Sequence, residues 1–339
     1  MKFKRLIAML LVSVMTVTLF AGCTKSSTAS DEKTTITDHA GREVKVTGNY
    51  NKIVSGYYIS TSLLISLGLK DKLIGIEAQG NKRPIYKMVD EKILSLPNVG
   101  TAKDFDLEGC ISLKPDLVIL PKKLVEEAKT LEEMGITVIV VNPENDKLLK
   151  ETAQIIGKAT GTEERANKLI FYYDTKYEML NNVSKDLENK PKVYLSGMSD
   201  ILESSTSSMY QNTVIEKAGG VNASKELTDK KWAKISYEQL ITYNPDIIVI
   251  ASGAKYKKQD ILNNKQLSNI NAVKNNAVYT MPSSIEAWDS PVPAGILGTM
   301  WLSSIINEKE YSFDKFKDDV VGFYKEFYGI DIDKSLITK

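Results

Sequence analysis

The residues of this sequence that could do chemistry are mainly aromatic and cationic. The chain of 339 residues has one histidine, His39, and it contains no Gly-x-Ser-x-Gly elbow and no glycine-rich phosphate loop. Catalysis usually needs a base near neutral pH or a nucleophile with its partner. A bare transition-metal site needs several histidine or cysteine ligands. We therefore predict no enzyme, no catalytic residue, no metal ligand and no cofactor, and we interpret His39 as a solvated turn residue.

A candidate binding site comes from the loops that follow the predicted strands. In open α/β sheets, ligands bind beyond the carboxyl ends of the strands. That rule selects the segments 57–58, 77–83, 121–123, 196–206, 252–256 and 281–289. Their aromatic and cationic side chains are Tyr57, Tyr58, Arg83, Lys122, Lys255 and Trp288. Stacking and charge-assisted hydrogen bonds from this set suit a bulky, partly apolar anion. Core packing for the aromatic residues and surface solvation for the lysines remain the alternatives.

A sequence motif that occurs twice, called the repeated phrase below, predicts the elements that must position these loops. Residues 108–120 and 238–250 share the pattern Glu-x-x-Ile-x-x-x-Pro-Asp followed by four branched apolar residues. Each glutamate falls in the first turn of a short helix, where a negative charge is favourable. Each proline ends that helix. The apolar run then predicts a strand buried on both faces, as in a parallel sheet. Two such units indicate two similar lobes.

Strands and helices alternate along both halves, which predicts an α/β fold with two Rossmann-like lobes and parallel sheets. The first lobe is expected at 34–159, opening with a hairpin over Thr35–Val46, and the second at 191–330. Between them, residues 160–190 read as one long helix of roughly 40 Å, which begins at a Thr160 capping box. Pro291–Ile306 is predicted to be a helix with Ser290 as its N-cap.

The N-terminal segment reads as a secretory signal over residues 1–22. It has a basic start, a continuous apolar run, and small residues just before Cys23. The stretch Leu-Phe-Ala-Gly-Cys resembles the lipobox of bacterial lipoproteins, in which the cysteine is lipidated. A transmembrane anchor is the alternative. Residues 23–33 are small and polar, as expected of a flexible tether. Cys110, the other cysteine, is predicted to lie in the core.

The charge balance argues against nucleic acid as a partner. Lys plus Arg is 44 and Asp plus Glu is 43, so the chain has no strong overall field. Hydrophobic residues make up 42% and charged residues 26%, as in an ordinary globular protein.

The order of these motifs resembles the class III substrate-binding lipoproteins of ABC importers, the family for ferric siderophores, haem and vitamin B12. The resemblance covers nearly all of the mature chain. It includes the Asp38 hairpin, Leu67-Gly68, Val99-Gly100, both Pro-Asp units and Ala218-Gly-Gly-Val-Asn222. It implies two lobes joined by one long helix, a ligand cleft between the lobes and only small closure on binding. It also implies a monomer tethered outside the cytoplasm that delivers its ligand to a permease dimer with its ATPase.

The resemblance adds four residues to the candidate site. Glu108 and Glu238 match the glutamates that dock on the permease in that family. Trp232 lies six residues before Glu238, where vitamin B12-binding relatives have a cleft tryptophan. The corresponding position of the first lobe is Ala102, which Lys103 follows.

The resemblance also narrows the range of candidate ligands. The stretch Thr101-Ala102-Lys103 lacks the tyrosine of haem-binding members, and Ser290-Pro291-Val292 lacks an arginine common in siderophore-binding members. We predict capture of an iron complex, a ferric siderophore. Cobalamin, haem or a molybdate-type oxyanion are the alternatives, and an extracellular chelatase-like enzyme is a minor one.

Overall fold

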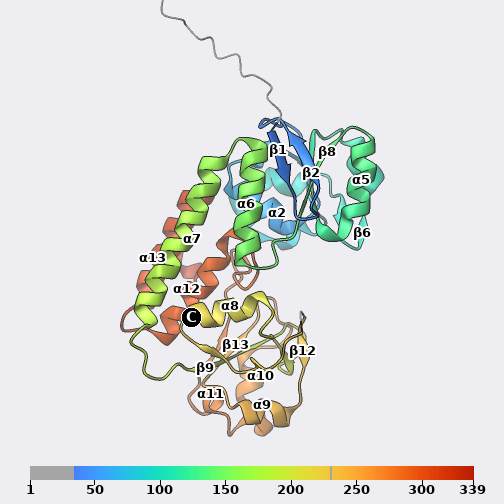
Figure 1. Cartoon of the computed structure of the whole chain (residues 1–339). Coiled ribbons are helices and arrows are strands. Elements are labelled where there is room, and N and C mark those ends of the chain that lie inside the picture. The colour runs from blue at the N-terminus through green and yellow to red at the C-terminus, as the bar shows by residue number, and fades with distance from the viewer. Residues whose placement is uncertain (1–33, 230) are drawn as a thin grey trace, which may run out of the picture. The chain divides into compact units, whose positions relative to one another are not determined.

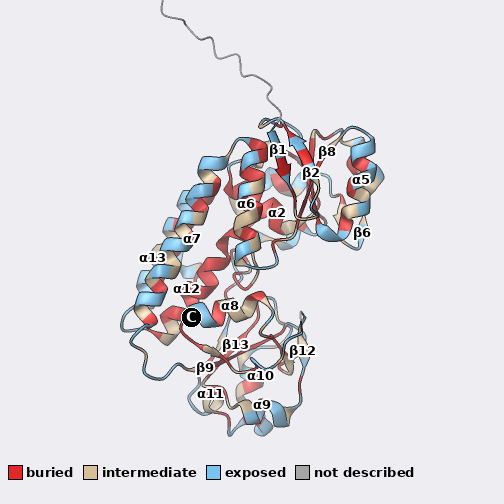
Figure 2. Ribbon diagram, viewed as in Figure 1, coloured by how far each residue is buried: buried red, intermediate tan, exposed pale blue. Residues whose placement is uncertain are grey.

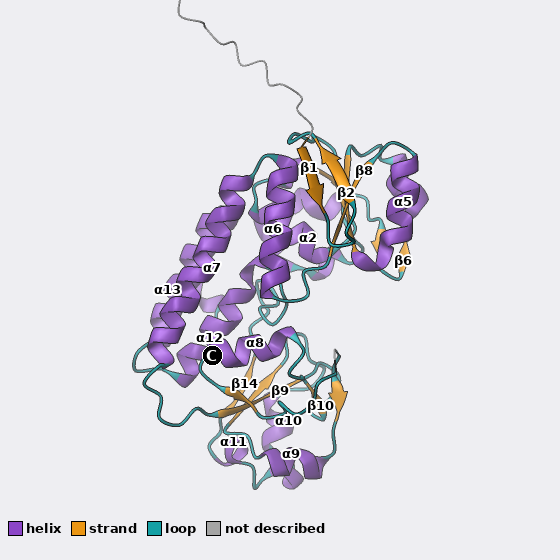
Figure 3. Cartoon of the chain, in the orientation of Figure 1, coloured by secondary structure: helices purple, strands orange, loops and turns teal. Residues whose placement is uncertain are grey.

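The computed structural model describes residues 34–229 and 231–339 (Figure 1). The predicted signal segment, Cys23 and the tether lie outside the described residues. None of the helices described is long and apolar enough to cross a membrane. The described chain has the predicted α/β architecture, in which two sheets are flanked by helices (Figure 3).

The sheet of the first lobe is entirely parallel, as predicted. Its strands lie in the order β4 (Leu73–Gly75), β3 (Ile53–Ser55), β7 (Leu117–Pro121) and β8 (Thr137–Val141). Side chains of a strand point alternately to the two faces of its sheet. Ile119 accordingly joins one apolar cluster and Leu120 another, and both are fully buried. The unbroken apolar run of β7 therefore reflects a sheet covered on both faces.

The first lobe also holds two small hairpins and its covering helices. One hairpin pairs β1 with β2 antiparallel next to β8, and the other pairs β5 with β6. These elements are β1 (Thr34–Thr37), β2 (Glu43–Val46), α2 (Tyr58–Ser66), α3 (Pro84–Val89), β5 (Gly100–Thr101), β6 (Asp104–Phe105), α4 (Leu107–Ser112), α5 (Val125–Glu133) and α6 (Asp146–Thr160).

The sheet of the second lobe is mixed, whereas the sequence predicts a parallel one. Its parallel part consists of β9 (Lys192–Ser196), β13 (Ile247–Ile250) and β14 (Val278–Thr280), and β11 (Val221–Asn222) also pairs with β9. Beyond β9, the short strand β10 (Glu203–Ser204) pairs antiparallel with β9, and β12 (Ala233–Lys234) pairs antiparallel with β10. Strands of two residues carry too little hydrophobic pattern to be recognised from sequence.

The helices of the second lobe include one that is buried along almost its whole length. Every residue of α12 from Ile296 to Ser304 is buried, as Figure 2 shows. The helix begins only at Ile296, after a 3-10 turn over Pro293–Gly295, so the predicted N-cap at Ser290 is wrong. The helices are α8 (Tyr210–Lys217), α9 (Tyr237–Tyr243), α10 (Lys258–Leu262), α11 (Asn271–Lys274), α12 (Ile296–Ile306) and α13 (Phe313–Tyr328).

The linking helix α7 (Glu163–Ser184) is shorter than the sequence predicts. Its 22 residues correspond to roughly 33 Å. The helix starts late because α6 extends to Thr160 and Gly161, with φ of +70°, ends α6. The predicted capping box at Thr160 is wrong, since the hydroxyl of Thr160 instead bonds the carbonyl of Ile156 and contacts the hydroxyl of Thr162.

The repeated phrase folds as predicted. Glu108 and Glu238 lie exposed in the first turns of α4 and α9, and both helices end before their prolines. Asp106 caps α4 by accepting the N–H of Gly109, and Ser236 caps α9 by accepting that of Gln239. Cys110, on the inner side of α4, is fully buried as expected.

Candidate functional site

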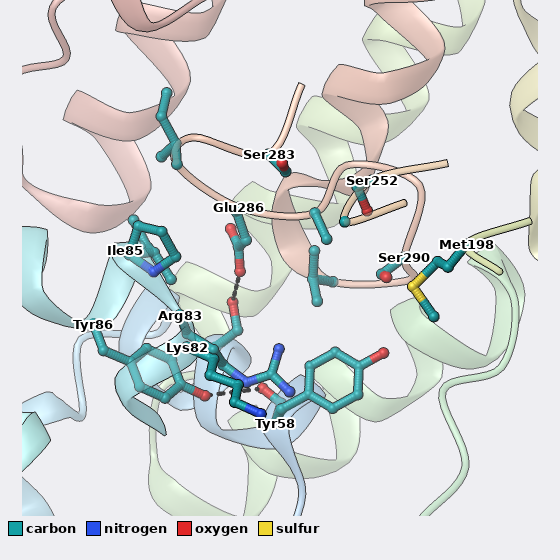
Figure 4. A pocket seen from close by; sticks show the side chains of 16 residues that line it. Tyr58, Lys82, Arg83, Ile85, Tyr86, Met198, Ser252, Ser283, Glu286 and Ser290 are labelled. Carbon is teal, nitrogen blue, oxygen red and sulfur yellow. Dashed lines mark hydrogen bonds between the residues drawn. The ribbon is translucent and has the colours of Figure 1, made fainter. Parts of the chain in front are cut away.

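A cavity of about 460 Å³ is lined by residues of both lobes (Figure 4). Each part of its wall follows a strand or opens a helix at the carboxyl edge of a sheet. The lining residues are Tyr58, Ser62, Lys82, Arg83, Pro84, Ile85, Tyr86, Met198, Ser252, Gly253, Ser283, Ile285, Glu286, Ala287, Ser290 and Val292. The cavity thus lies where the strand-end rule places ligands, and five of the six predicted segments contribute to it or border it. The segment 121–123 does not line it.

Arg83, a lining residue, is held in place by two neighbours, Glu77 behind the wall and Tyr58 within it. Its Nε donates to Glu77 Oε1 at 3.3 Å, and its guanidinium carbon lies 4.0 Å from the centre of the Tyr58 ring. Tyr57 packs edge-on against Tyr58 with ring centres 5.2 Å apart. Figure 4 shows the Tyr58 hydroxyl directed toward the side of the cavity where Ser290 and Met198 lie. The structure therefore brings Tyr57, Tyr58 and Arg83 together, and Tyr58 and Arg83 line the cavity whereas Tyr57 does not.

The charge of Arg83 is balanced by a buried carboxylate. Glu77 is only 5% exposed and accepts hydrogen bonds from Thr61 Oγ1 at 2.5 Å and the Tyr86 hydroxyl at 2.8 Å, besides that from Arg83. Burial raises the pKa of Glu77, and these three donors oppose that rise. Because Arg83 is paired, it adds little net positive charge to the cavity.

Glu286 is a lining residue that the sequence does not single out. Its Oε1 lies 2.5 Å from Ser62 Oγ, and its Oε2 lies 3.3 Å from the Tyr328 hydroxyl. Burial raises the pKa of Glu286 to about 7, and the hydroxyls around it only partly oppose that rise. Figure 4 shows its side chain directed toward the region of Arg83 and Tyr58. The cavity wall thus holds a carboxyl without an ionic hydrogen-bond partner among the described residues.

Asp289 supports the wall from behind. It is 4% exposed and accepts the N–H of Ser252 at 2.8 Å and the Ser252 hydroxyl at 2.5 Å. Burial raises the pKa of Asp289, and the two bonds from Ser252 oppose that rise. These bonds fix the loop after β13 against the loop after β14.

The other predicted site residues are not in the wall. Trp288 is buried in the core, where its indole N–H donates to the Tyr324 hydroxyl at 2.9 Å and its ring packs on Phe316. Trp232 is half-buried against the core outside the lining. The remaining predicted cations, all exposed, are Lys103, Lys122 and Lys255. One cation that sequence reasoning passed over, Lys82, does line the cavity, and it lay inside the predicted segment 77–83.

The hydroxyl groups were also missed. Ser62, Ser252, Ser283 and Ser290 line the cavity, but serine is too common for its position to stand out in a sequence. Only their places after predicted strands, or on the helix that follows β3, could have marked them. The wall is consequently richer in uncharged hydrogen-bonding groups, and poorer in free cations, than the sequence suggests.

His39 is not a solvated turn residue, which corrects the sequence interpretation. Its Nδ1 accepts the N–H of Asn142 at 2.8 Å, its Nε2 lies 3.5 Å from a Glu151 oxygen, and its side chain is 11% exposed. Burial lowers the pKa of His39, and Glu151 opposes that shift. The histidine joins the β1–β2 hairpin to the end of β8. Across residues 34–229 and 231–339, no group of three His, Cys, Asp or Glu side chains is placed to hold a metal ion.

The chain is similar in sequence to several proteins that are named as substrate-binding proteins. The uncharacterized ABC transporter substrate-binding lipoprotein YvrC of Bacillus subtilis is 28% identical, over 84% of this chain and 91% of that protein. The molybdate-binding protein MolA of Haemophilus influenzae is 22% identical, over 86% of this chain and 90% of that protein. The Fe(3+)-citrate-binding protein YfmC of Bacillus subtilis is 26% identical, over 81% and 89%.

Solved structures share the fold. A periplasmic solute binding protein from Veillonella parvula superposes with a TM-score of 0.79 and 27% identity, covering 90% of this chain and 95% of that one. The molybdate-bound MolA of Haemophilus influenzae superposes with a TM-score of 0.77 and 20% identity, covering 88% and 99%. These neighbours support the α/β fold and its arrangement in two lobes.

The model of the periplasmic binding protein family matches residues 53–285, which include both sheets and most of the cavity wall. Together with the fold and the position of the cavity, this match shows that the chain belongs to the periplasmic binding protein family of ABC importers.

Proposed function

We propose that this protein is the extracytoplasmic substrate-binding component of an ABC importer that captures a ferric siderophore and delivers it to the membrane permease. The observation that carries the proposal is the cavity at the carboxyl edges of both sheets. Its wall offers hydroxyls from Tyr58 and four serines, one paired arginine and the apolar side chains of Ile85, Met198 and Val292. Such a wall suits a compact metal chelate with a partly apolar periphery.

The size of the cavity favours a compact chelate, such as ferric citrate, over a corrinoid or a bare oxyanion. Its volume of about 460 Å³ lies in the lower half of the range of about 300–1,000 Å³ usual for drug-sized ligands. A corrinoid exceeds that size. A tetrahedral oxyanion is only as large as a few water molecules, each of which takes about 30 Å³, so most of the cavity would stay unfilled. Haem is less favoured because haem-binding members of the family have a tyrosine in the stretch that is Thr101-Ala102-Lys103 here.

A molybdate-type oxyanion remains the second candidate. MolA, whose name states its ligand, is a relative over most of both chains. Arg83, Lys82 and the serine hydroxyls could also bind a small oxyanion. The names of other relatives, the Fe(3+)-citrate-binding YfmC and the petrobactin-binding YclQ of Bacillus subtilis, support the iron proposal instead.

The proposal includes two attachments. Glu108 and Glu238 would dock on the permease dimer, which is supported by their exposure on the two copies of the repeated unit. Cys23 would carry the lipid that holds a monomeric protein at the membrane. Exchange of Cys23 for Ala is expected to move the protein from the membrane fraction to the medium or periplasm, and unchanged membrane association would contradict the anchor.

The ligand proposal is tested by thermal unfolding with ferric enterobactin, ferrichrome, ferric citrate, cobalamin, haem and molybdate. A ligand at a hundred times its Kd stabilises the folded state by about 2.7 kcal/mol. We expect a shift with at least one ferric complex. The variant Ala287→Trp, which fills the cavity, should abolish that shift, whereas Ile241→Trp on the exposed face of α9 should retain it. Stabilisation by molybdate alone would select the second candidate, and no shift with any compound would refute the ligand proposal.

A further inference from the structure

Glu286 belongs to a closed ring of three hydrogen-bonding groups, of which Glu286 and Ser62 line the cavity and Tyr328 lies behind them. The contacts run from Glu286 Oε1 to Ser62 Oγ at 2.5 Å, from Ser62 Oγ to the Tyr328 hydroxyl at 2.9 Å, and from that hydroxyl to Glu286 Oε2 at 3.3 Å. The three residues come from the loop after β14, from α2 and from α13. The ring therefore joins elements that are far apart in the sequence.

Counting protons indicates which form of Glu286 suits the ring best. Three oxygen–oxygen contacts need three protons, and the two hydroxyls supply only two. If the carboxyl is ionised, it takes both hydroxyl protons and leaves no proton between Ser62 and Tyr328. If the carboxyl is protonated, each of the three groups donates once and accepts once. The geometry therefore fits a neutral Glu286.

The surroundings of Glu286 offer little compensation for a negative charge. The polar groups that face it are the hydroxyls of Ser62, Tyr324 and Tyr328, with Tyr173 of α7 further away. Arg83 is the positive group that acts on it, and that guanidinium already bonds Glu77. Glu77 differs from Glu286 in this respect, because the Arg83 guanidinium is hydrogen-bonded to Glu77. In a poorly solvated wall an uncompensated charge acts strongly on whatever fills the cavity.

We propose that Glu286 is a proton-dependent specificity residue: the cavity accepts an anionic ligand while this carboxyl carries its proton and rejects that ligand once the proton is lost. This inference rests on the proposed function. Apparent affinity scales with the fraction of protein in the competent form, so the apparent Kd for an anion rises about tenfold per pH unit above the midpoint of the transition. An uncharged ligand has no such dependence.

The test compares the wild-type protein with Glu286→Gln between pH 5.5 and 8.5. The amide can replace the protonated carboxyl in the ring but cannot ionise. Calorimetric titrations use ferric enterobactin and molybdate as anionic probes and ferrichrome as an uncharged one. Because both proteins meet the same probe at the same pH, changes in the probe itself cancel. We expect the ratio of wild-type to variant Kd for the anionic probe to rise at least tenfold across the range, and the ratio for ferrichrome to stay constant.

A ligand-independent measurement completes the test. The infrared difference between the wild type and Glu286→Gln at pH 6 should contain the carbonyl band of a protonated carboxylic acid, and an ionised Glu286 at that pH would overturn the inference. The inference would be overturned if the ratio of wild-type to variant Kd for a bound anionic probe did not change with pH. It would also be overturned if both proteins bound ferrichrome but neither bound an anionic probe. Either result would leave the binding function intact. Failure of both proteins to bind any probe would refute the proposed ligand class and this inference together.

Discussion

Replacing Glu286 by Gln should change how the stability of the ligand-free protein depends on pH. Burial raises the pKa of Glu286 from its ordinary value of 4.5 to about 7. Between these two values the unfolded chain releases the proton while the folded protein keeps it. Stability falls with rising pH wherever the folded state binds more protons. The contribution of Glu286 is thus fully present below pH 4.5, and it is lost as the pH rises toward about 7.

The expected size follows from the two pKa values. One pKa unit is worth about 1.4 kcal/mol, so the wild type should lose on the order of 3 kcal/mol of unfolding free energy from this group. The variant lacks that loss, and its amide can donate to Ser62 as the protonated carboxyl does. Glu77, Asp146 and Asp289 also have raised pKa values, but they titrate in both proteins, so their effects cancel in the difference.

Urea unfolding at intervals between pH 4.5 and 8.5 measures the effect, provided that the slope m is the same for both proteins. The two should be similarly stable at pH 4.5, and Glu286→Gln should be the more stable one at pH 8. Glu238→Gln is the control, and its difference from the wild type should be nearly constant over this range. Hydrogen bonds at the start of α9 lower the pKa of Glu238 from its ordinary value of 4.5, so its contribution is lost only at more acid pH. A pH-independent difference between the wild type and Glu286→Gln would refute the reasoning.

Three further predictions concern docking, the core and the backbone. Joint exchange of Glu108 and Glu238 for Ala should lower uptake of labelled ligand into cells while the calorimetric Kd of the purified protein stays the same; unchanged uptake would remove their docking role. Trp288→Ala should cost about 3–5 kcal/mol in urea unfolding, because the indole is buried and bonded, and a cost below 1 kcal/mol would contradict its place in the core. Gly100→Ala should also destabilise, by about 1 kcal/mol or more, since φ is +82° and a Cβ would lie 2.1 Å from a backbone oxygen; an unaltered melting temperature would show that the β5–β6 hairpin can adjust.

The repeated phrase could be predicted from sequence because its causes are local. A glutamate in a first helical turn, a proline that ends the helix and a run of branched residues each act on their own neighbours. The same holds for the strands β7 and β13, whose buried apolar runs the structure confirms. The fold class follows from the alternation of such local units.

The site could be predicted only as a set of segments. The strand-end rule selects the right loops, but it does not say which way each side chain turns. Trp288 illustrates the limit, because it lies in a correctly chosen segment and points into the core, two residues after Glu286, which lines the cavity. Lys122 and Lys255 likewise follow strands and remain exposed.

Glu286 could not be predicted because its partners are distant in the sequence. Ser62 lies 224 positions away and Tyr328 lies 42 positions away. A glutamate with no local partner reads as a surface residue, since glutamate is rarely buried unless paired. Only the packing of α2 and α13 beside the loop after β14 makes this carboxyl a buried one.

The contacts of α7 bear on how such a cavity can discriminate between ligands. Arg165 donates to the carbonyls of Ser66 and Phe327, and the Tyr173 hydroxyl shares its one proton between the carbonyls of Val292 and Pro293, at 3.0 and 3.1 Å. One end of the helix is thereby bonded to α2 of the first lobe, and its middle to the segment before α12. A large rotation of the lobes would break buried hydrogen bonds. Each broken bond would leave a buried polar group without a partner, at a cost of about 1–3 kcal/mol. Since a ligand can shift a conformation only by its differential affinity, the cavity should select mainly through the groups already in its wall. Under that constraint a single ionisable lining residue has a large effect on the choice of ligand, because no large closure is available to compensate for its charge.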